Sequence, residues 1–441
     1  MSVSGRIVIV DSGLKHTGGH NFSYTRAVQA ALESRGFAVD ALGNRNMSAD
    51  LIRTTGYRPT FSIGTYDYPP GSGRFRDLAY LYAQSVIFGD ELWHGLRQVD
   101  AERCGLIFCH TVRDFELLGW RRCLWRLRPA GRVMMLMRDT PGWRRVGRWK
   151  RSWHPYFRIR PRSLNGMRRM LGARFTLLTD SELLSEDYAR VYRHRIVTVP
   201  IPINDSILRA STGEPSTLGK RYPLAADGFV RIGYLGDDRG VRGFSLLPQL
   251  VARASQEADV RTRFLIQCPN AASGHRDGRL SSAFEALAAL ASDTATGRVT
   301  LIPERLPDEE YAELLRHVDV VVIPYEGRGY REPTAGVFAE ALAMGKPVVV
   351  TGGTWMAHEL RRSGGGREFA DGDAADLAAK VVEVVKGYED YARRAEDFSP
   401  EWRRFHNSHR LAELLLEESG LAQEQPPVDR RVGAWARSET A

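Results

Sequence analysis

Short apolar segments alternate with amphipathic stretches in the first half of the chain. Residues 6–10, RIVIV, have the pattern of a buried strand, and a glycine-bearing loop then leads to a helical pattern that ends at Gly36. Further apolar segments are found at residues 105–110, 132–137, 175–179 and 195–203. Strands that consist almost entirely of apolar residues and alternate with helices are typical of a parallel sheet covered on both faces. We therefore expect such a sheet in the first half.

The same pattern restarts after residue 204. Its apolar segments are residues 230–236, 261–268, 298–303, 319–324 and 346–351. The predicted fold class is α/β, with two doubly wound, Rossmann-like parallel-sheet domains that face each other across a cleft. We place the domains at residues 1–203 and 204–402 and a terminal helix at 403–420. Residues 421–441 are polar, contain proline and lack periodicity, so we expect a disordered tail.

The composition is that of an ordinary globular protein. Of the 441 residues, 43% are hydrophobic and 26% are charged. No apolar run approaches the roughly 20 residues that span a bilayer, and the first ten residues lack the features of a signal peptide. The 4 cysteines form no CxxC pair, which favours a reduced, cytoplasmic setting without structural zinc.

Positive charge is concentrated between Arg121 and Arg169. The only acid in this stretch is Asp139, so its local charge is +15, and the rest of the chain is acidic because the whole carries +9. Within residues 141–162, Val146 and the tryptophans share one face of a helical wheel; these tryptophans are Trp143, Trp149 and Trp153. A basic amphipathic helix with tryptophan is typical of binding to an anionic membrane surface. The alternatives are tryptophans packed in the core and binding to single-stranded nucleic acid, which we do not expect because no nucleic-acid motif accompanies the segment.

A loop with glycine and arginine follows the first strand of the second half. The strand ends at Gly236, the loop carries Arg239 and Arg242, and Gly243 precedes a helical pattern. Guanidinium groups in a glycine-rich loop between a strand and a helix suit phosphate oxygens. The alternative is an ordinary α/β loop with solvated arginines.

Two carboxylates lie eight residues apart in the segment YREPTAGVFAEALAMGKPVVVTGG, residues 330–353. Glu332 precedes Pro333, which suits the first position of a helix, and Glu340 lies two turns further along. Eight helical positions amount to a net rotation of about 80°, so both side chains can address one neighbourhood.

Together these two segments resemble the C-terminal domain of the retaining, nucleotide-sugar-dependent glycosyltransferases of the GT-B fold, the glycosyltransferase family 4 group. The family pattern G-R-x4-K-G is matched at Gly236, Arg242 and Gly243, with arginine in place of lysine. The later E-x7-E-A-x-A-x-G-x-P pattern is matched from Glu332 through Glu340 to Pro347. The chain departs from the family pattern at Asp237, where the family has arginine, at Thr334-Ala335, where it has Phe-Gly, and at Arg138-Asp139, where it often has histidine.

The resemblance implies a role for each matched position. Arg242 and Arg239 would hold the diphosphate of the donor with the helix start at Thr334, Ala335, Gly336 and Val337, because a departing diphosphate needs preorganised donors. Glu340 would accept hydrogen bonds from the ribose, and Glu332 would address the transferred sugar. The expected activity is sugar transfer, with retention, from a nucleotide-diphosphate donor to a glycan or lipid-linked acceptor, as part of polysaccharide biosynthesis. The alternative is a catalytically silent binding subunit of the same fold.

In the first half, the resemblance assigns Gly18 and Gly19 to a flexible loop near the diphosphate and the acceptor, and the alternative is an ordinary turn between a strand and a helix. His110 and Arg138 follow successive strands, and His110 could hydrogen-bond a sugar hydroxyl. The alternative for both residues is a purely structural role. The terminal helix over 403–420 would return to the first domain. We expect no cofactor and no bound metal, since Asp373 in the acidic stretch 371–373 suits the N-cap of a helix better than a metal site.

Overall fold

The structure is a computed structural model. It describes residues 4–17, 20–65, 67, 74–141, 145–146, 150–151, 156–192, 195–203, 205–208, 217–222, 228–236, 238, 240–257, 259–272, 278–292 and 297–423. The expected tail lies outside the described residues beyond residue 423. Residues Leu421–Gln423 form a 3₁₀ turn, η4, and Leu421 is buried, so the structured part extends beyond residue 420.

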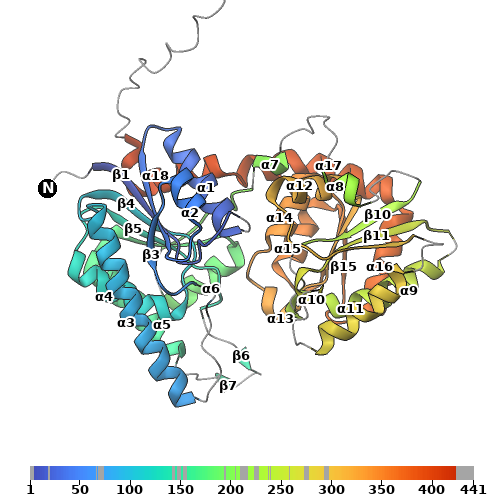
Figure 1. The fold of residues 1–441 in the computed structure, drawn as a ribbon, viewed down its shortest axis with the longest axis horizontal. Coiled ribbons are helices and arrows are strands. Elements are labelled where there is room, and N and C mark those ends of the chain that lie inside the picture. The colour runs from blue at the N-terminus through green and yellow to red at the C-terminus, as the bar shows by residue number, and fades with distance from the viewer. Residues whose placement is uncertain are drawn as a thin grey trace, which may run out of the picture.

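The N-terminal lobe is built on a parallel sheet of seven strands in the order β3-β2-β1-β4-β5-β8-β9 (Figure 1). The strands are β1 (Ser4–Val10), β2 (Ala38–Asn44), β3 (Arg58–Phe61), β4 (Cys104–Cys109), β5 (Arg132–Leu136), β8 (Phe175–Thr179) and β9 (Ile196–Thr198). The helices are α1 (His20–Glu33), α2 (Ala49–Thr55), α3 (Arg74–Gln98), α4 (Asp114–Leu127), α5 (Tyr156–Leu171), η1 (Gly172–Arg174) and α6 (Glu182–Tyr192). The five strands predicted from the sequence are present, and β2 and β3 were not predicted.

Alternate residues of the central strand β1 enter two separate cores. In β1, Val8 and Val10 pack with α3, α4, α5 and α6, whereas Ile7 and Ile9 pack with α1, α2 and the C-terminal helix. This alternation follows from the two-residue period of a strand, and it explains why both sets of residues are apolar.

The C-terminal lobe contains a second parallel sheet, in the order β12-β11-β10-β13-β14-β15. Its strands are β10 (Val230–Tyr234), β11 (Thr262–Gln267), β12 (Val299–Ile302), β13 (Val320–Ile323), β14 (Val348–Thr351) and β15 (Gly366–Phe369). Its helices are η2 (Gly240–Arg242), η3 (Phe244–Leu246), α9 (Leu247–Gln256), α10 (Pro269–Ala272), α11 (Gly278–Ala291), α12 (Asp308–His317), α13 (Gly327–Tyr330), α14 (Gly336–Ala343), α15 (Trp355–Ser363) and α16 (Ala374–Lys386). The two doubly wound sheets confirm the predicted fold class.

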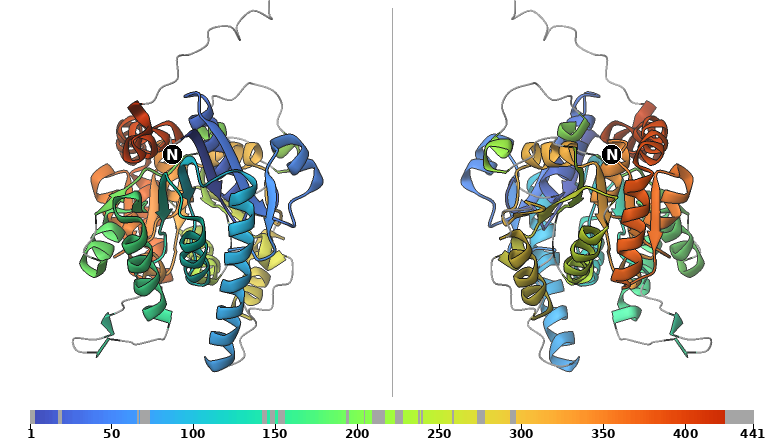
Figure 2. Two further views of the ribbon diagram at one scale, coloured as in Figure 1. Left: turned by 90° about the vertical axis from the view of Figure 1, so that its left-hand side faces the viewer. Right: turned by 90° about the vertical axis from the view of Figure 1, so that its right-hand side faces the viewer.

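Two long helices lead back from the second lobe to the first. They are α17 (Tyr388–Phe405) and α18 (Ser408–Ser419), and the short helices α7 (Asp205–Leu208) and α8 (Thr217–Arg221) belong to the connection in the other direction. The indole Nε1 of Trp402 donates to the carbonyl of Ala339 at 2.9 Å, which fixes α17 to α14. Helix α18 begins after Asn407, whose side chain caps it, and contributes Leu411 and Leu415 to the core beneath β1. Figure 2 shows this helix, in red, beside the N-terminal lobe.

The basic segment 141–162 is not one continuous helix. Residues Arg145–Val146 (β6) and Lys150–Arg151 (β7) form a small antiparallel pair, and α5 begins only at Tyr156 (Figure 1). The prediction of a helix through residues 145–151 is therefore wrong. Trp143, Trp149 and Trp153 lie outside the described residues, so their proposed membrane contact stays a prediction.

Candidate active site

Both sheets reverse their strand order beside their first strand. In the N-terminal sheet the reversal lies between β1 and β4, and in the C-terminal sheet it lies between β10 and β13. Ligands of doubly wound sheets bind outside the carboxyl ends of the strands at such reversals. The residues that follow these strands, among them Asp11, His110, Gly236 and Tyr325, therefore define the candidate site.

Gly236 lies close to the two groups that are expected to hold phosphate. It has a φ of 92°, and its N–H donates to Oε1 of Gln267 at 2.7 Å. A Cβ at this position would lie 3.3 Å from Cγ2 of Val337 and 3.9 Å from Nη1 of Arg242. The end of β10, the guanidinium of Arg242 and the first turn of α14 thus meet at one place.

Gly243 allows the loop with Arg242 to pack against the end of β13. Its φ is 72°, and a Cβ here would lie 1.9 Å from the carbonyl oxygen of Pro324. The next residue, Tyr325, accepts a hydrogen bond from Nη1 of Arg242 at 3.0 Å, and the guanidinium lies 5.0 Å from its ring centroid. The side chain of Arg242 is thereby oriented before any ligand binds.

Helix α14 begins later than the sequence suggested. Its first residue is Gly336, and Ala335 is its N-cap with no side-chain hydrogen bond, so Pro333 lies before the helix and the prediction that it opens the helix is wrong. The N–H groups of the first turn have no partner within the helix and carry its positive dipole end. Glu332 lies in the preceding bend, half-buried and 3.3 Å from Nε of Arg331.

Glu340 lies on α14 and contacts the neighbouring helix α12. Its Oε2 accepts a hydrogen bond of 2.7 Å from the hydroxyl of Tyr311. Among the described residues, no hydrogen bond reaches its other oxygen, Oε1. Burial raises the pKa of Glu340 to about 7, with the hydroxyl of Tyr311 acting in the opposite direction and Asp308 adding to the rise. Oε1 of Glu340 is therefore the oxygen of this carboxyl group that is left for a ligand.

The N-terminal side of the site is a stack of three side chains. The ring of Tyr24 lies 4.4 Å from that of His110, and the guanidinium of Arg138 lies 4.5 Å from the ring of Tyr24. His110 is fully buried, with Nε2 at 2.9 Å from Oγ1 of Thr25 and Nδ1 at 3.1 Å from Oγ1 of Thr111. A sugar hydroxyl would have to displace one of these contacts to reach the imidazole of His110.

Asp180 joins the predicted residues of the two lobes. Its Oδ2 lies 3.3 Å from Nε of Arg138 and accepts a hydrogen bond of 3.0 Å from Oγ1 of Thr334. Burial raises the pKa of Asp180, and Arg138 opposes that rise. A second contact between the lobes runs from the Ser23 hydroxyl to Asp308 at 2.6 Å.

Asp180 was not identified as a site residue from the sequence, although its position after a strand is the same feature that identified His110. It is the first polar residue after an apolar strand, β8. Tyr311 lies on a helix and had no comparable signal.

Four residues that the sequence resemblance connected with the diphosphate lie outside the described residues. They are Gly18, Gly19, Asp237 and Arg239. Their assignment to the diphosphate, and the replacement of the usual arginine by Arg239, stay predictions.

The acidic stretch at residues 371–373 has a structural explanation. Asp373 caps α16, and its Oδ1 accepts from the N–H of Ala375 at 2.8 Å and of Asp376 at 3.0 Å. Within the described ranges there is no group of three or more His, Cys, Asp or Glu side chains that could hold a metal ion. In the same ranges, no helix has the length and apolar character needed to cross a membrane.

Comparisons with known proteins agree with the resemblance seen in the sequence. Residues 230–387 match the family model described as "Glycosyl transferases group 1". A glycosyltransferase from Rickettsia africae ESF-5 is similar in structure, with a TM-score of 0.65 and 12% identity over 94% of this chain and 98% of that chain. The Anabaena protein HepE in complex with UDP-glucose has a TM-score of 0.62 and 13% identity over 95% and 99% of the two chains. No match was found among curated protein sequences.

The same fold also occurs in a protein with another activity. A UDP-GlcNAc 2-epimerase from Neisseria meningitidis has a TM-score of 0.58 and 11% identity over 95% of this chain and 99% of that chain. At such identities the likeness shows the fold alone. The resemblance to GT-B glycosyltransferases is therefore confirmed by the family model for the C-terminal domain and by the fold for nearly the whole chain.

Proposed function

We propose that this chain, whose C-terminal domain matches the group 1 glycosyl transferases, transfers a sugar from a nucleotide-diphosphate donor to a glycan or lipid-linked acceptor. The observation that carries the proposal is the meeting of Gly236, Arg242 and the first turn of α14 at the strand reversal of the second sheet. A guanidinium and a helix N-terminus beside a glycine without a side chain form a receptor for a diphosphate.

The chemistry of the transfer follows from these groups. The bond between the anomeric carbon and the diphosphate breaks, an acceptor hydroxyl oxygen bonds to that carbon, and the leaving phosphate oxygen would take up the hydroxyl proton. Negative charge grows on the leaving oxygen meanwhile, and Arg242 and the N–H groups of Gly336 and Val337 would stabilise it. Glu340 would hold the ribose through Oε1, and Glu332 would address the sugar. The lobes face each other at Asp180 and Thr334, so the acceptor would enter from the side of Arg138.

Three finer points belong to the proposal. Retention of the anomeric configuration is supported by the spacing of Glu332 and Glu340, which resembles that of retaining enzymes. Independence from metal is supported by the role of Arg242 and the helix in balancing the charge. A peripheral position at the inner face of the cell membrane is supported by the concentration of positive charge between Arg121 and Arg169.

The test begins with donor binding and ends with transfer. Thermal shifts with UDP-, GDP- and ADP-sugars should identify one donor, since a ligand at 100 times its dissociation constant adds about 2.7 kcal/mol to stability. NMR of the product formed with that donor, with and without a chelator, then reports the anomer and the metal requirement. A product with inverted anomeric configuration would contradict retention. Loss of transfer in the presence of the chelator would contradict independence from metal.

A silent binding subunit is the second candidate. It is favoured by Asp237 and by Thr334-Ala335, which replace residues of the family pattern. A subunit of this kind would bind the donor but would not release nucleoside diphosphate from it, even with acceptor present. Turnover of the bound donor distinguishes the two functions.

A further inference from the structure

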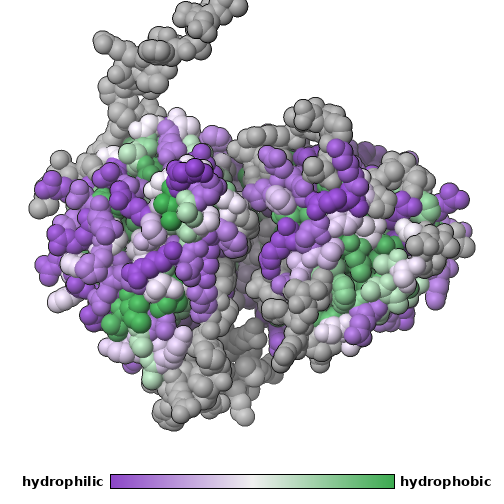
Figure 3. All heavy atoms as spheres, in the orientation of Figure 1, coloured by the Kyte–Doolittle hydropathy of each residue, from purple (hydrophilic) through white to green (hydrophobic). Residues whose placement is uncertain are grey.

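Two strongly exposed aromatic side chains, Tyr82 and Trp125, lie on neighbouring helices of the N-terminal lobe. Six large apolar side chains are exposed among the described residues, and four of them lie on α3 and α4: Tyr80, Tyr82, Ile87 and Trp125. Tyr82 and Trp125 are each 63% exposed. Figure 3 shows an apolar area on the N-terminal lobe, where Figure 1 places these helices. Tyr80 and Ile87 lie on a different face of α3 from Tyr82, since positions 80 and 82 are about 200° apart on a helix. Tyr82 and Trp125 line one groove, and exposed aromatic residues that share a groove indicate a binding surface.

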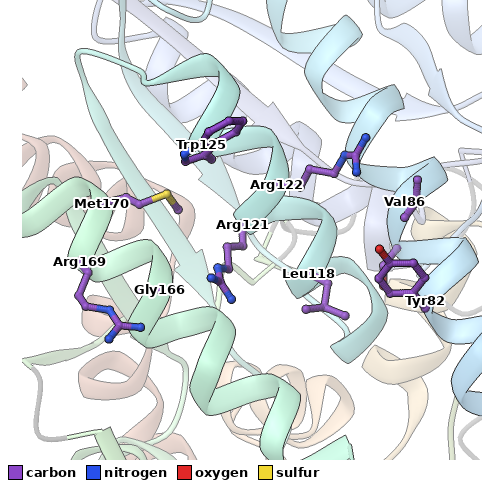
Figure 4. Close-up of a pocket in the computed structure, with 10 residues that line it drawn as sticks. Tyr82, Val86, Leu118, Arg121, Arg122, Trp125, Gly166, Arg169 and Met170 are labelled. Atoms are coloured by element: carbon purple, nitrogen blue, oxygen red, sulfur yellow. The ribbon is translucent and has the colours of Figure 1, made fainter.

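Helix α4 turns a mixed apolar and basic face outward. Leu118, Arg121, Arg122 and Trp125 have the spacing of one helix face, whereas Leu117, Trp120 and Leu124 are buried against the sheet. The outward face forms the floor of a groove of about 610 Å³ between α3 and α5. Figure 4 shows Arg121 and Trp125 between Tyr82 on α3 and Arg169 on α5. We call this surface the α4 groove.

Two of the three arginines of the α4 groove have no acidic partner among the described residues. Among the described residues, Arg121 and Arg169 form no ion pair, and the side chain of Arg121 extends over Gly166, where a Cβ would lie 2.8 Å from its Nε. Asp90, an acid on α3, already pairs with Arg122 at 3.5 Å and with Arg126 at 2.6 Å. Helix α5 contains no acidic residue. Arg121 and Arg169 are therefore available to pair with an anionic partner.

We propose that the α4 groove docks the protein on an anionic phospholipid surface. The partner must be both apolar and anionic, which describes the headgroup region of such a bilayer. Tyrosine and tryptophan favour the level of the headgroups, and arginine binds lipid phosphates through its planar guanidinium. Trp125 and Tyr82 enter this region while Arg121 and Arg169 contact phosphate oxygens. The proposal rests on the peripheral membrane position proposed above and names the surface that would make the contact. It uses none of the tryptophans of segment 141–162 and does not depend on the proposed transfer.

Flotation of the full chain with vesicles tests the proposal. The vesicles contain phosphatidylglycerol and phosphatidylcholine, and pure phosphatidylcholine is the reference. The test variant Arg121→Gln/Trp125→Ser/Arg169→Gln removes two arginines and one exposed aromatic ring. The control Arg403→Gln/Arg404→Gln/Phe405→Ser removes the same groups from the exposed end of α17. Because all six residues are exposed, both variants should fold, which circular dichroism and thermal unfolding will verify.

The wild type and the control should bind the anionic vesicles and lose binding with added salt. The test variant should bind at least about 25-fold more weakly, because each arginine near the surface contributes about a fivefold factor. The proposal is refuted if the wild type does not bind, or if the test variant binds like the wild type. Equal weakening of the control would also refute it, because the attraction would then be unspecific. If the test variant keeps vesicle binding but loses a concentration-dependent dimer of the wild type, the groove is assigned to a second copy of the chain. Loss of nucleic-acid binding with vesicle binding kept would assign the groove to nucleic acid.

Discussion

Replacement of Glu340 by glutamine tests the proposed ribose contact through its dependence on pH. Burial raises the pKa of Glu340 to about 7, so the carboxylate is lost as the pH falls through neutrality. If only the carboxylate accepts the ribose hydroxyls, about nine tenths of the protein is competent at pH 8 and about one tenth at pH 6. The wild-type affinity for the donor should therefore fall by about tenfold over this range.

The Glu340→Gln variant should bind the donor more weakly at pH 8 and with little dependence on pH. The loss should correspond to about 1.5–3 kcal/mol, the range for a hydrogen bond to a charged group. Isothermal titration with an intact nucleotide sugar is the suitable assay, because a terminal phosphate would itself titrate near a pKa of about 6.

Tyr311→Phe supplies the matched control for this experiment. The hydroxyl of Tyr311 donates to Glu340 and lowers the pKa of that carboxyl, so its removal should move the midpoint of the binding curve to higher pH. The reasoning is refuted if wild-type affinity is constant between about pH 6 and about pH 8, or if Glu340→Gln retains the wild-type slope.

Three further predictions concern stability. Gly243→Ala should lower the free energy of unfolding by more than Gly372→Ala in urea titrations, because both have positive φ but only Gly243 lies against a carbonyl; about 1–2 kcal/mol is expected for the backbone conformation alone. Burial on α4 raises the pKa of Glu116 to about 7, so the folded state keeps a proton that the unfolded state loses. The free energy of unfolding of the wild type should therefore fall as the pH rises from about 4.5 to about 7, by on the order of 3 kcal/mol. Glu116→Gln should remove this dependence on pH in urea titrations. Asp373→Ala should cost about 1 kcal/mol through loss of a helix cap and leave transfer unchanged, whereas lost transfer would point to a role in catalysis.

The strongest sequence patterns predicted the sheets well. The central strands are buried on both faces, so their continuous apolar runs identified them without knowledge of the fold. The strands that were missed are β2, β3 and β15. In β2, the sequence AVDALGN includes aspartate, glycine and asparagine, and its first residues are exposed or half-buried. Such strands depend on pairing with a neighbour, which local sequence does not reveal.

Two local predictions failed where the backbone departs from the helix that the local sequence favours. Pro333 suits a helix start, yet the chain before α14 bends so that Thr334 reaches Asp180 in the other lobe. Residues 143–153 have a helical distribution of apolar residues, but residues 145–146 and 150–151 pair as two short antiparallel strands.

The part of the candidate site that lies in sequence motifs was predictable, and the part that depends on tertiary packing was not. Arg242 and Glu340 lie in motifs with fixed spacing, so they could be identified along the chain. Tyr311 and Asp180 join the site from other elements through contacts of 2.7 and 3.0 Å. Their part in the site follows from the packing of α12 and from the approach of the two lobes.

The central claim is that Arg242 and the groups around it promote the departure of a nucleoside diphosphate from a nucleotide sugar. The most direct measurement is nucleoside diphosphate release from the donor that gives the largest thermal shift, with membrane and glycan fractions supplied as acceptors. We predict release by the wild type, transfer of labelled sugar to one fraction, and loss of both in Arg242→Ala. The account would be contradicted by a donor that binds tightly but stays intact with every fraction. Equal release of nucleoside diphosphate by Arg242→Ala and the wild type would also contradict it.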